Sequence, residues 1–448
     1  MPDSAIRLPT GAWLAATFVV YLSGAAASAA ISESQTLVVY NAASAEAIVL
    51  KNAYLDAHPG IPAENVVSLS DATLLTANVT RAEYETKVRD PIRNHLLTPG
   101  NPTPTDIIVI VLIRPFPHRL LDFDANLSGD SPGLAGNEFG AGDADFAAVD
   151  SELTLLWQLI GAGEAGGTMD SRSDNVIDNP YHMATAAIDS FDRSNIETAK
   201  TLTNRSNIAW TLGGGGATQL TPGDMCLVAR IDGNTLSDAL ASIDRAQTLI
   251  INRARVRILL DEYDLSAAPD LDDDPLFLSN DPFLAGDDYE ETRDAMQAAG
   301  WDVRYDDTAD FISSAEETSL LIAYASYGEN HSVNGGGENP PGIATYIDGF
   351  NFAPGAVFNT VESFNGRELN GVVPSAPFHN QGQVADFIAA GGTFGIGHVF
   401  EPESFSLPDN EFLLQNLLNN GLTWGEAAWP GLPALSGQQV VLGDPLAA

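Results

Sequence analysis

Two stretches near the end of the chain decide the fold class: SLLIAYASYGENH at residues 319–331 and AVFNTVESFNG at residues 356–366. Each begins as an apolar run typical of a buried strand and ends in polar residues, Glu329-Asn330-His331 in the first and Glu362-Ser363-Phe364-Asn365-Gly366 in the second. In an open α/β sheet, ligands and chemistry lie at the carboxyl ends of the strands. We therefore place the candidate site at these two loops.

Strand-like runs alternate with helical patterns along the chain, which predicts an α/β fold with mostly parallel sheets and helices on both faces. We expect strands at 37–40, 66–69, 107–113, 225–231, 256–260, 301–305, 319–326, 356–362, 393–400 and 438–442. We expect helices near 44–57, 80–97, 235–252, 288–299, 380–390 and 409–420.

The length of 448 residues exceeds one ordinary core and suits two α/β units or one large composite domain; we expect two three-layer α/β/α units. We expect an N-terminal domain at 30–262, an acidic junction at 263–288 and a C-terminal domain at 289–448. The passage from 114 to 148, rich in Pro, Gly and Asp, is too long for an ordinary connection. It predicts a functional loop or a flap.

The first 29 residues have the pattern of a secretory signal peptide. An apolar run at 11–22 follows Arg7 and precedes Ala27-Ser28-Ala29, which suits cleavage after Ala29. The alternative is a short membrane anchor, but the run is below the roughly twenty residues that span a bilayer. We expect an exported protein, periplasmic or extracellular, without a membrane contact after cleavage.

The formal net charge of -40, from 60 acidic and 20 basic residues, disfavours nucleic acid and anionic membranes as partners. It indicates a solvated acidic surface suited to a saline medium, with cation capture as the alternative. The partners that we expect are peptides or cell-surface proteins.

The acidic loops also raise the question of calcium. Oxygen ligands alternate at Asp122, Asp124, Asn126 and Ser128, but the central glycine and terminal glutamate of an EF-hand are missing. We favour a solvated loop there and at 270–274, and a weak structural calcium site stays the alternative. No other cofactor is expected, since Gly395-Ile396-Gly397 lacks the third glycine and the following helix of a dinucleotide site.

Three residues are the candidates for catalysis. His331 could accept a proton while a neighbouring acceptor, such as Glu329, fixes its tautomer, and Ser363 stands at the end of the second strand, where it attacks only when a base removes its proton. For each we weigh a plain turn or capping role, because serine and histidine are common in such loops. Cys226, the single cysteine, lies in an apolar strand pattern and is expected to be a buried small side chain.

Taken together, the order of these segments resembles the gingipain-type cysteine peptidases of the caspase-like class. In those proteins a His-Gly loop precedes a Cys-x-x-Gly loop, and the domain closes on Gly-Asp-Pro, which is Gly443-Asp444-Pro445 here with Gly425-Glu426-Ala427 upstream. The likeness covers roughly residues 255–448 and implies a caspase-like fold for the C-terminal half. It implies His331 as the general base and Ser363 at the position of the nucleophile, with Glu329, or alternatively Asp348, as the residue that orients the histidine.

A likeness over the whole length is to an uncharacterised family of exported bacterial proteins, and it implies no activity. Its features are Leu37 to Asn41, Ile61-Pro62, Asn65-Val66, Tyr84, Ile92, Ala148 to Leu153, Asn179-Pro180-Tyr181, Arg230 to Gly233, Tyr324 to Asn330, Glu401-Pro402 and Gly443-Asp444-Pro445.

Serine in place of cysteine separates this chain from the peptidases, because a hydroxyl needs a well-aligned base whereas a thiol readily gives a thiolate. We therefore expect a degenerate, non-catalytic binding module, with a Ser-His hydrolase of peptide or ester bonds as the alternative. In that case the backbone amides around Asn365 and Gly366 are the candidate oxyanion hole.

Two further patterns are open to more than one interpretation. The segment Tyr324 to Gly328 resembles a nucleophile elbow, with His398 later in the chain, but Tyr324 replaces the first glycine, so we interpret His398 as a core or rim histidine. Asp150-Ser151-Glu152 before the apolar run 153–160 predicts a capped helix start, with a pocket role as the alternative.

Overall fold

The computed structural model describes residues 31–122, 145–160, 177–198, 201–202, 220–262, 289–308, 311–328, 347, 349–362, 364–369, 383–400, 402 and 407–448. The expected signal peptide at 1–29, the acidic junction at 263–288 and most of the long passage before 148 lie outside these residues. Within them, no helix is both long and apolar enough to cross a bilayer.

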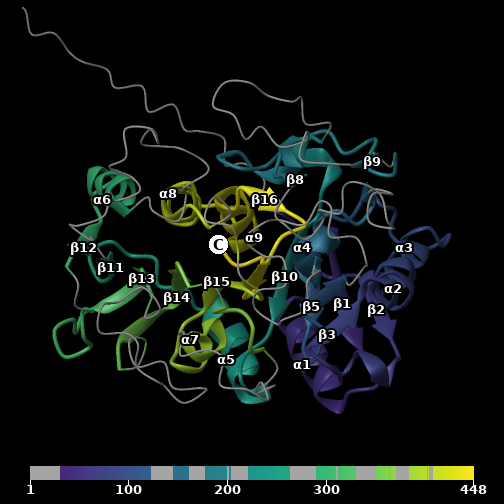
Figure 1. Ribbon diagram of the computed structural model, residues 1–448, viewed down its shortest axis with the longest axis horizontal. Helices are drawn as coiled ribbons and strands as arrows, with labels where there is room; N and C mark the ends of the chain where they lie inside the picture. The colour runs from purple at the N-terminus through teal and green to yellow at the C-terminus, as the bar shows by residue number, and fades with distance from the viewer. Residues whose placement is uncertain are drawn as a thin grey trace, which may run out of the picture.

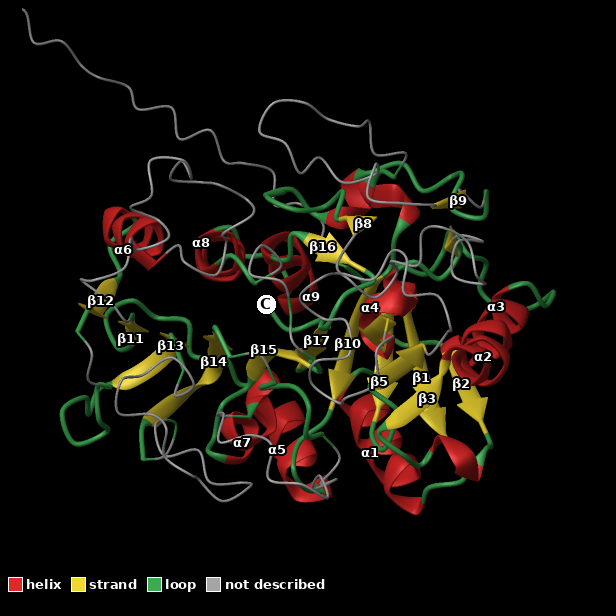
Figure 2. Ribbon diagram, viewed as in Figure 1, coloured by secondary structure: helices red, strands yellow, loops and turns green. Residues whose placement is uncertain are grey.

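Ten strands form the main sheet of the described protein (Figures 1 and 2). They are β1 (Thr36–Asn41), β2 (Val66–Leu69), β4 (Val109–Ile113), β10 (Leu227–Ile231), β11 (Arg257–Asp261), β12 (Asp302–Asp306), β13 (Leu320–Ser326), β14 (Asn351–Thr360), β15 (Phe394–His398) and β17 (Gln439–Leu442). Each expected strand is present, because an apolar run of this length fits a strand buried on both faces. The α/β class with a mostly parallel sheet is confirmed.

The strand order is β12-β11-β13-β14-β15-β17-β10-β4-β1-β2. Neighbouring strands pair in parallel, with one exception. The exception is the pair β15 and β17, which is antiparallel over four residue pairs from Gly395↔Leu442 to His398↔Gln439. The contact between β17 and β10 is the single parallel pair Arg230↔Leu442.

Both halves of the sequence contribute to this one sheet, whereas two sheets were predicted. The last strand, β17, lies between β15 of the C-terminal half and β10 of the N-terminal half. The sequence pattern shows where strands occur but not which strands become neighbours, and that is why the joining escaped prediction. The two halves nevertheless have the same strand order. When the strands of each half are numbered along the chain, β2-β1-β4-β10 and β12-β11-β13-β14-β15 both begin with the order 2-1-3-4.

Helices cover both faces of the sheet. They are α1 (Ala45–Ala57), α2 (Arg81–Glu83), α3 (Asp90–Leu96), α4 (Val149–Thr154), α5 (Leu236–Ala246), α6 (Tyr289–Ala298), α7 (Val384–Ala389), α8 (Asn410–Leu414) and α9 (Trp424–Ala428), with π-helical turns at Tyr84–Arg89 and Gln415–Asn419. In Figure 1, α1, α5 and α7 lie on one side of the sheet and α6, α8 and α9 on the other. Short 3₁₀ turns occur at Glu33–Gln35, Ala63–Asn65, Ala72–Leu74, Ile188–Ser190, Pro222–Asp224 and Trp429–Gly431.

Short strands form three small accessory sheets. They are β3 (Asn78–Thr80), β5 (Arg119–Asp122) and β6 (Asp145–Ala148); β8 (Ile177–Asp178) with β16 (Ala434–Leu435); and β7 (Leu159–Ile160) with β9 (Thr201–Leu202). The sequence did not predict them, because two to four residues are too few for a periodic pattern.

Two expected helix boundaries were wrong. The helix near 235–252 ends at Ala246, and the helix expected to continue to residue 160 is α4, which starts at Val149 and ends at Thr154. Asp150 does not cap α4; its carboxylate accepts from the Arg230 guanidinium, with Nε at 2.8 Å. Tertiary ion pairing therefore replaces the local capping that the sequence suggested.

Arg230 lies at the centre of a fully buried ionic cluster. Its Nη1 also donates to Asp232 at 3.3 Å, and both carboxylates are buried. Such a cluster is stable only when each charge has its partner, since an unpaired buried charge is expensive. The segments of Asp150 and Arg230, far apart in sequence, are thereby fixed to each other beside β10.

A second polar cluster binds the end of the chain to α1. Asp444, buried after β17, accepts from Tyr54 Oη at 3.0 Å and from His58 Nε2 at 2.7 Å, and His58 Nδ1 lies 3.1 Å from Glu33. These carboxylates outweigh the effect of burial and raise the pKa of His58. The Gly-Asp-Pro end thus has a structural contact with the first helix.

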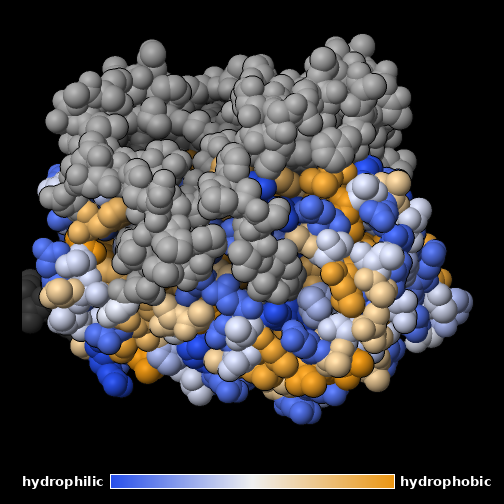
Figure 3. Space-filling view, turned by 60° about the horizontal axis from the view of Figure 1, so that its bottom comes forward, coloured by the Kyte–Doolittle hydropathy of each residue, from blue (hydrophilic) through white to orange (hydrophobic). Residues whose placement is uncertain are grey.

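The described residues form two hydrophobic clusters, of which one joins the two halves and has Val39, Leu112, Val228, Ile258 and Ile396 among its members. On the surface, hydrophilic and hydrophobic side chains are mixed over the side of the molecule that carries α1, α5 and α7 (Figure 3). Cys226 is buried, as expected, and burial raises the pKa of its thiol.

Candidate functional site

The carboxyl ends of β11, β13, β14 and β15 meet at one edge of the sheet, because these four strands are parallel and adjacent. With β12 they follow the order 2-1-3-4-5, in which β11 and β13 form the point where the winding reverses. Ligands of open α/β sheets bind in the crevice outside such a point. Topology therefore supports the edge that the sequence singled out.

The three catalytic candidates His331, Ser363 and Glu329 lie outside the described residues, and so does Asp348. The strands that lead to them are described. Ser326, the last residue of β13, pairs with Thr360, the last of β14, so the two loops leave the sheet side by side. The expectation that these loops start at one edge is confirmed; the roles of the three residues stay a prediction.

Close packing fixes the first turn of the two loops against each other. Gly328 has a φ of +81°, and a Cβ built on it would lie 2.2 Å from Glu362 Cγ and 2.8 Å from Thr360 Oγ1. Only glycine fits both this conformation and this contact. The Glu362 side chain, fully buried, is thereby held over the end of β13.

Asp261, the last residue of β11, is a buried carboxyl group at the point where the winding reverses. It has no exposed surface, and its Oδ2 accepts from the Ile312 backbone at 3.1 Å. Burial raises the pKa of Asp261 to about 7. The Ile312 hydrogen bond and the charge of Arg304 act in the opposite direction, but their effect is smaller. A carboxyl group with a pKa near neutrality in such a position is typical of a functional site.

The neighbouring Glu262 belongs to a second carboxyl cluster. The Tyr305 hydroxyl is 2.5 Å from Glu262 Oε2 and also contacts Glu290. Burial, followed by these two carboxylates, raises the pKa of Tyr305. The end of β11 is thus acidic, and it carries the charge that would attract a cationic group.

His398, the last residue of β15, is oriented by the loop after β14. It is fully buried, its Nδ1 lies 3.0 Å from the Glu362 carbonyl, and burial lowers its pKa to about 4. Since the carbonyl can only accept, Nδ1 carries the proton and Nε2 is left as an acceptor. Nε2 has no hydrogen-bond partner among the described residues.

Asn365, in the loop after β14, also contacts His398. Its Oδ1 accepts from the His398 backbone N–H at 2.6 Å, so its Nδ2 lies beside the same residue. That Nδ2, and Thr360 Oγ1 at the end of β14, also lack partners in the described part of the chain. One unused donor and one unused acceptor therefore stand together, which is the pattern that a peptide group satisfies with its C=O and N–H.

Glycines let the loop after β14 approach β15 closely. Gly366 N–H donates to the His398 carbonyl at 2.9 Å, and a Cβ on Gly366 would lie 2.7 Å from the Gly397 backbone. This contact explains why Gly366 is required, and why Gly397 faces it within β15. The glycines of β15 therefore allow close packing, Gly397 against Gly366 and Gly395 against Val384.

The elbow interpretation of Tyr324 to Gly328 does not fit the structure. Ser326 is a sheet residue without exposed surface, and its Oγ accepts from the Gly328 N–H at 3.2 Å. A nucleophile elbow needs an exposed serine on a sharp turn between strand and helix.

Asp261 was not predicted as a site residue, whereas His398 was expected to be a core or rim histidine and is indeed buried at the end of β15. Asp261 follows the apolar strand of β11 directly, as the two chosen loops follow theirs. The same rule, applied to each strand and not only to two, would have found it. The partners of His398 come from residues 362 and 365, and sequence spacing does not show such contacts.

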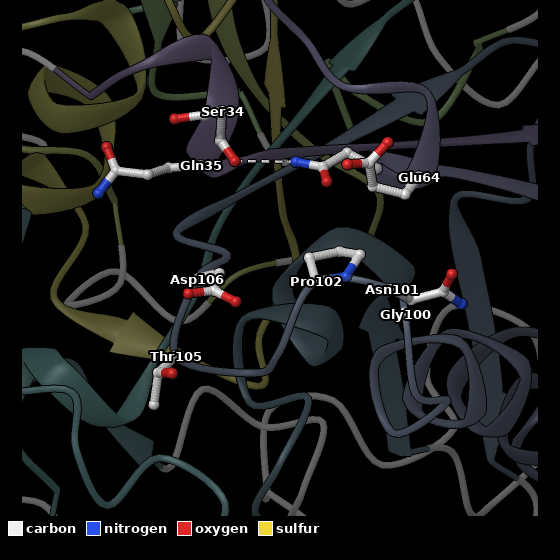
Figure 4. Close-up of a pocket in the computed structure, with 9 residues that line it drawn as sticks. Ser34, Gln35, Glu64, Gly100, Asn101, Pro102, Thr105 and Asp106 are labelled. Atoms are coloured by element: carbon white, nitrogen blue, oxygen red, sulfur yellow. Dashed lines mark hydrogen bonds between the residues drawn. The ribbon is translucent and has the colours of Figure 1, made fainter.

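A pocket of about 420 Å³ lies elsewhere, beside the start of β1 (Figure 4). Its wall includes Gln35, Glu64, Asn65 and Asp106, and Asn65 Nδ2 donates to the Ser34 carbonyl at 2.8 Å. Asp106 accepts from Thr103 N–H at 2.8 Å. Because local turns use these polar groups, we assign no ligand to this hollow.

Metal binding receives no support from the described residues, since no three His, Cys, Asp or Glu side chains among them are grouped to hold an ion. Most of the calcium candidates, at 124–128 and 270–274, lie outside the described ranges. The weak calcium site therefore stays a prediction.

The chain matches no family model, no curated protein and no solved structure. The edge formed by β11, β13, β14 and β15 is therefore the main structural indication of its function.

Proposed function

We propose that the chain is an exported binding module that takes an extended peptide at the carboxyl edge of β11, β13, β14 and β15. The observation that carries the proposal is the pairing of a free donor, Asn365 Nδ2, with a free acceptor, His398 Nε2, within the described residues. Buried polar groups are normally satisfied, so a pair without partners marks a place for a ligand. A peptide group supplies the complementary acceptor and donor in one unit.

The negative charge of the edge indicates that the proposed peptide is positively charged. Asp261, Glu262 and Glu362 are buried within or next to it, and the chain as a whole carries a net charge of -40. Electrostatic attraction favours basic peptides in the encounter and repels acidic ones. We therefore expect a lysine- or arginine-containing peptide.

The scaffold of this proposal is caspase-like. Support comes from the resemblance of residues 255–448 to the gingipain-type peptidases and from β11 to β15 and β17, which form one contiguous block of the sheet. Within that proposal the chain keeps the scaffold with Ser363 in the position of the cysteine. Export by the segment 1–29 belongs to the same proposal, and N-terminal sequencing of the secreted protein tests it.

Binding is tested with fluorescent decapeptides of matched length that are basic, neutral or acidic, measured by anisotropy at fixed ionic strength. We expect the basic peptide to bind and Asn365→Asp, which keeps the Oδ1 acceptor and removes the donor, to weaken it about tenfold or more. Asn78→Asp, a change of the same kind at an exposed residue of β3, is the control. Equal binding by wild type and Asn365→Asp would refute the proposal.

The second candidate function is a Ser-His hydrolase of peptide or ester bonds. It is favoured by the pairing of Ser326 with Thr360, which starts the loops of His331 and Ser363 at neighbouring strand ends. A fluorophosphonate probe decides between the two. Labelling of wild type and of the control Ser70→Ala, but not of Ser363→Ala or His331→Ala, would establish the hydrolase and remove the non-catalytic assignment.

A further inference from the structure

Two arginines lie close together where the N-terminal and C-terminal halves meet. Arg119 is the first residue of β5, and Arg367 follows β14. Their segments are fixed to each other because the His118 imidazole, through Nε2, lies 2.8 Å from the Arg367 carbonyl. Both arginine residues are only 9% exposed.

Arg119 differs from other buried arginines of the described chain. Arg230 is paired with two aspartates, and Arg193 donates to the carbonyls of Met225 and Ile107. Arg119 has no ion pair or side-chain hydrogen bond with any described residue, and its Nε is buried without a partner. A lone guanidinium is unexpected in a protein with 60 acidic residues to choose from.

The surroundings of Arg119 add positive charge and little that neutralises it. Burial, and then the like charge of Arg367, lower the pKa of Arg119 to about 10, so it stays charged at neutral pH. His118 is fully buried, and burial holds its pKa well below the ordinary value, so the ring is neutral. Glu368 is the acidic neighbour, and burial raises its pKa to about 7.

We propose that Arg119 and Arg367 form an anion site that binds the carboxylate of a ligand. A guanidinium presents a planar fork of donors that matches a carboxylate in two hydrogen bonds. A phosphate fits the same fork, but the acidic surface of the protein would repel its second charge more strongly. The site therefore takes a singly charged carboxylate, which a free organic acid or the C-terminus of a peptide supplies.

This site is separate from the peptide edge of the proposed function and does not depend on it. The two are connected through the loop after β14, since Asn365 and Arg367 are two residues apart in that loop. Failure of basic peptides to bind at the edge would leave the carboxylate site untouched, and the reverse also holds.

Calorimetric titration and thermal unfolding of the full chain test the site. The probes are acetate, tetra-alanine with a blocked N-terminus and a free carboxylate, the same peptide amidated at its C-terminus, and inorganic phosphate at equal ionic strength. The variants are Arg119→Met and Arg367→Gln, and the control is Arg255→Met, at an exposed arginine.

We expect wild type and Arg255→Met to bind a carboxylate probe and to unfold at higher temperature in its presence. Either site variant should weaken binding about tenfold or more, as the loss of charged hydrogen bonds predicts. Without ligand, Arg119→Met should unfold at the same or a higher temperature than wild type, because it removes an unpaired buried charge. That result distinguishes ligand binding from a structural role.

Tetra-alanine that binds only with its free carboxylate would identify a peptide C-terminus as the ligand, and acetate binding with no gain for the peptide would identify a small acid. Three outcomes would overturn the proposal. They are no binding of either carboxylate, tighter binding of phosphate, and unchanged carboxylate binding by Arg119→Met and Arg367→Gln.

Discussion

Replacement of Asp261 by asparagine is expected to stabilise the protein at neutral and alkaline pH. Its carboxyl group is buried at the end of β11 with a pKa raised to about 7, against 3.8 for the ordinary group. Asparagine has the same shape, and its Oδ1 still accepts from the Ile312 N–H. The change therefore removes the charge and keeps the hydrogen bond.

The expected gain follows from the difference between the folded and unfolded pKa. Below pH 3.8 the carboxyl group is protonated in both states and contributes nothing. Between there and pH 7 the unfolded chain loses its proton while the folded chain keeps it, so wild-type stability falls as the pH rises. Above pH 7 the loss is constant, at about 4 kcal/mol for about three pKa units.

Urea unfolding of wild type and Asp261→Asn at pH 5 and pH 8 measures this effect. We expect the advantage of the variant to be about 2 kcal/mol at pH 5 and about 4 kcal/mol at pH 8. Asp307→Asn, at an exposed residue that directly follows β12, is the matched control and should show no such rise. An advantage that is absent, or equal at both pH values, would refute a raised pKa for Asp261.

Three further substitutions test other parts of the structure by the same unfolding measurement. Thr360→Val should leave stability unchanged or raise it by about 1 kcal/mol, because it removes a buried hydroxyl that has no partner in the described chain; a clear loss would show that the hydroxyl is satisfied. His58→Gln should cost more stability at pH 5 than at pH 9, since the raised pKa of His58 contributes fully below 6.5 and is lost as the pH rises through the folded value; an equal loss at both would contradict it. Arg230→Met should destabilise by about 3–5 kcal/mol, because it leaves two buried aspartates without their cation, and a loss below 1 kcal/mol would contradict that.

The strands of the main sheet were predictable because each is a local apolar run. β4 and β13 are read from the sequence within one or two residues of their observed ends. Neighbour relations were not predictable in this way. The position of β17 between β15 and β10 depends on contacts between segments more than 200 residues apart in sequence, as Arg230↔Leu442 shows.

The candidate site was predictable as a place but not as a set of side chains. The rule that ligands lie at carboxyl ends of strands led to the loops after β13 and β14, and the parallel pairing of Ser326 with Thr360 supports it. His398 could not be chosen, because its state depends on burial and on the Glu362 carbonyl. Neither property is visible in a single sequence.

The two halves have the same strand order, so the buried carboxyl groups near their strand ends can be compared. This comparison favours a ligand site in the second half. In the first half, the buried carboxylates of Asp150 and Asp232 are paired with Arg230. In the second half, Asp261 is equally buried, yet it forms no ion pair with a described residue. The charge of Arg304 lowers the pKa of Asp261 without offsetting the effect of burial. A buried carboxyl group that is only partly balanced lowers stability at neutral pH, and we expect a ligand to supply further positive charge at the end of β11. A basic side chain of a bound peptide meets that requirement, and it should bind more weakly to Asp261→Asn even though the variant is the more stable protein.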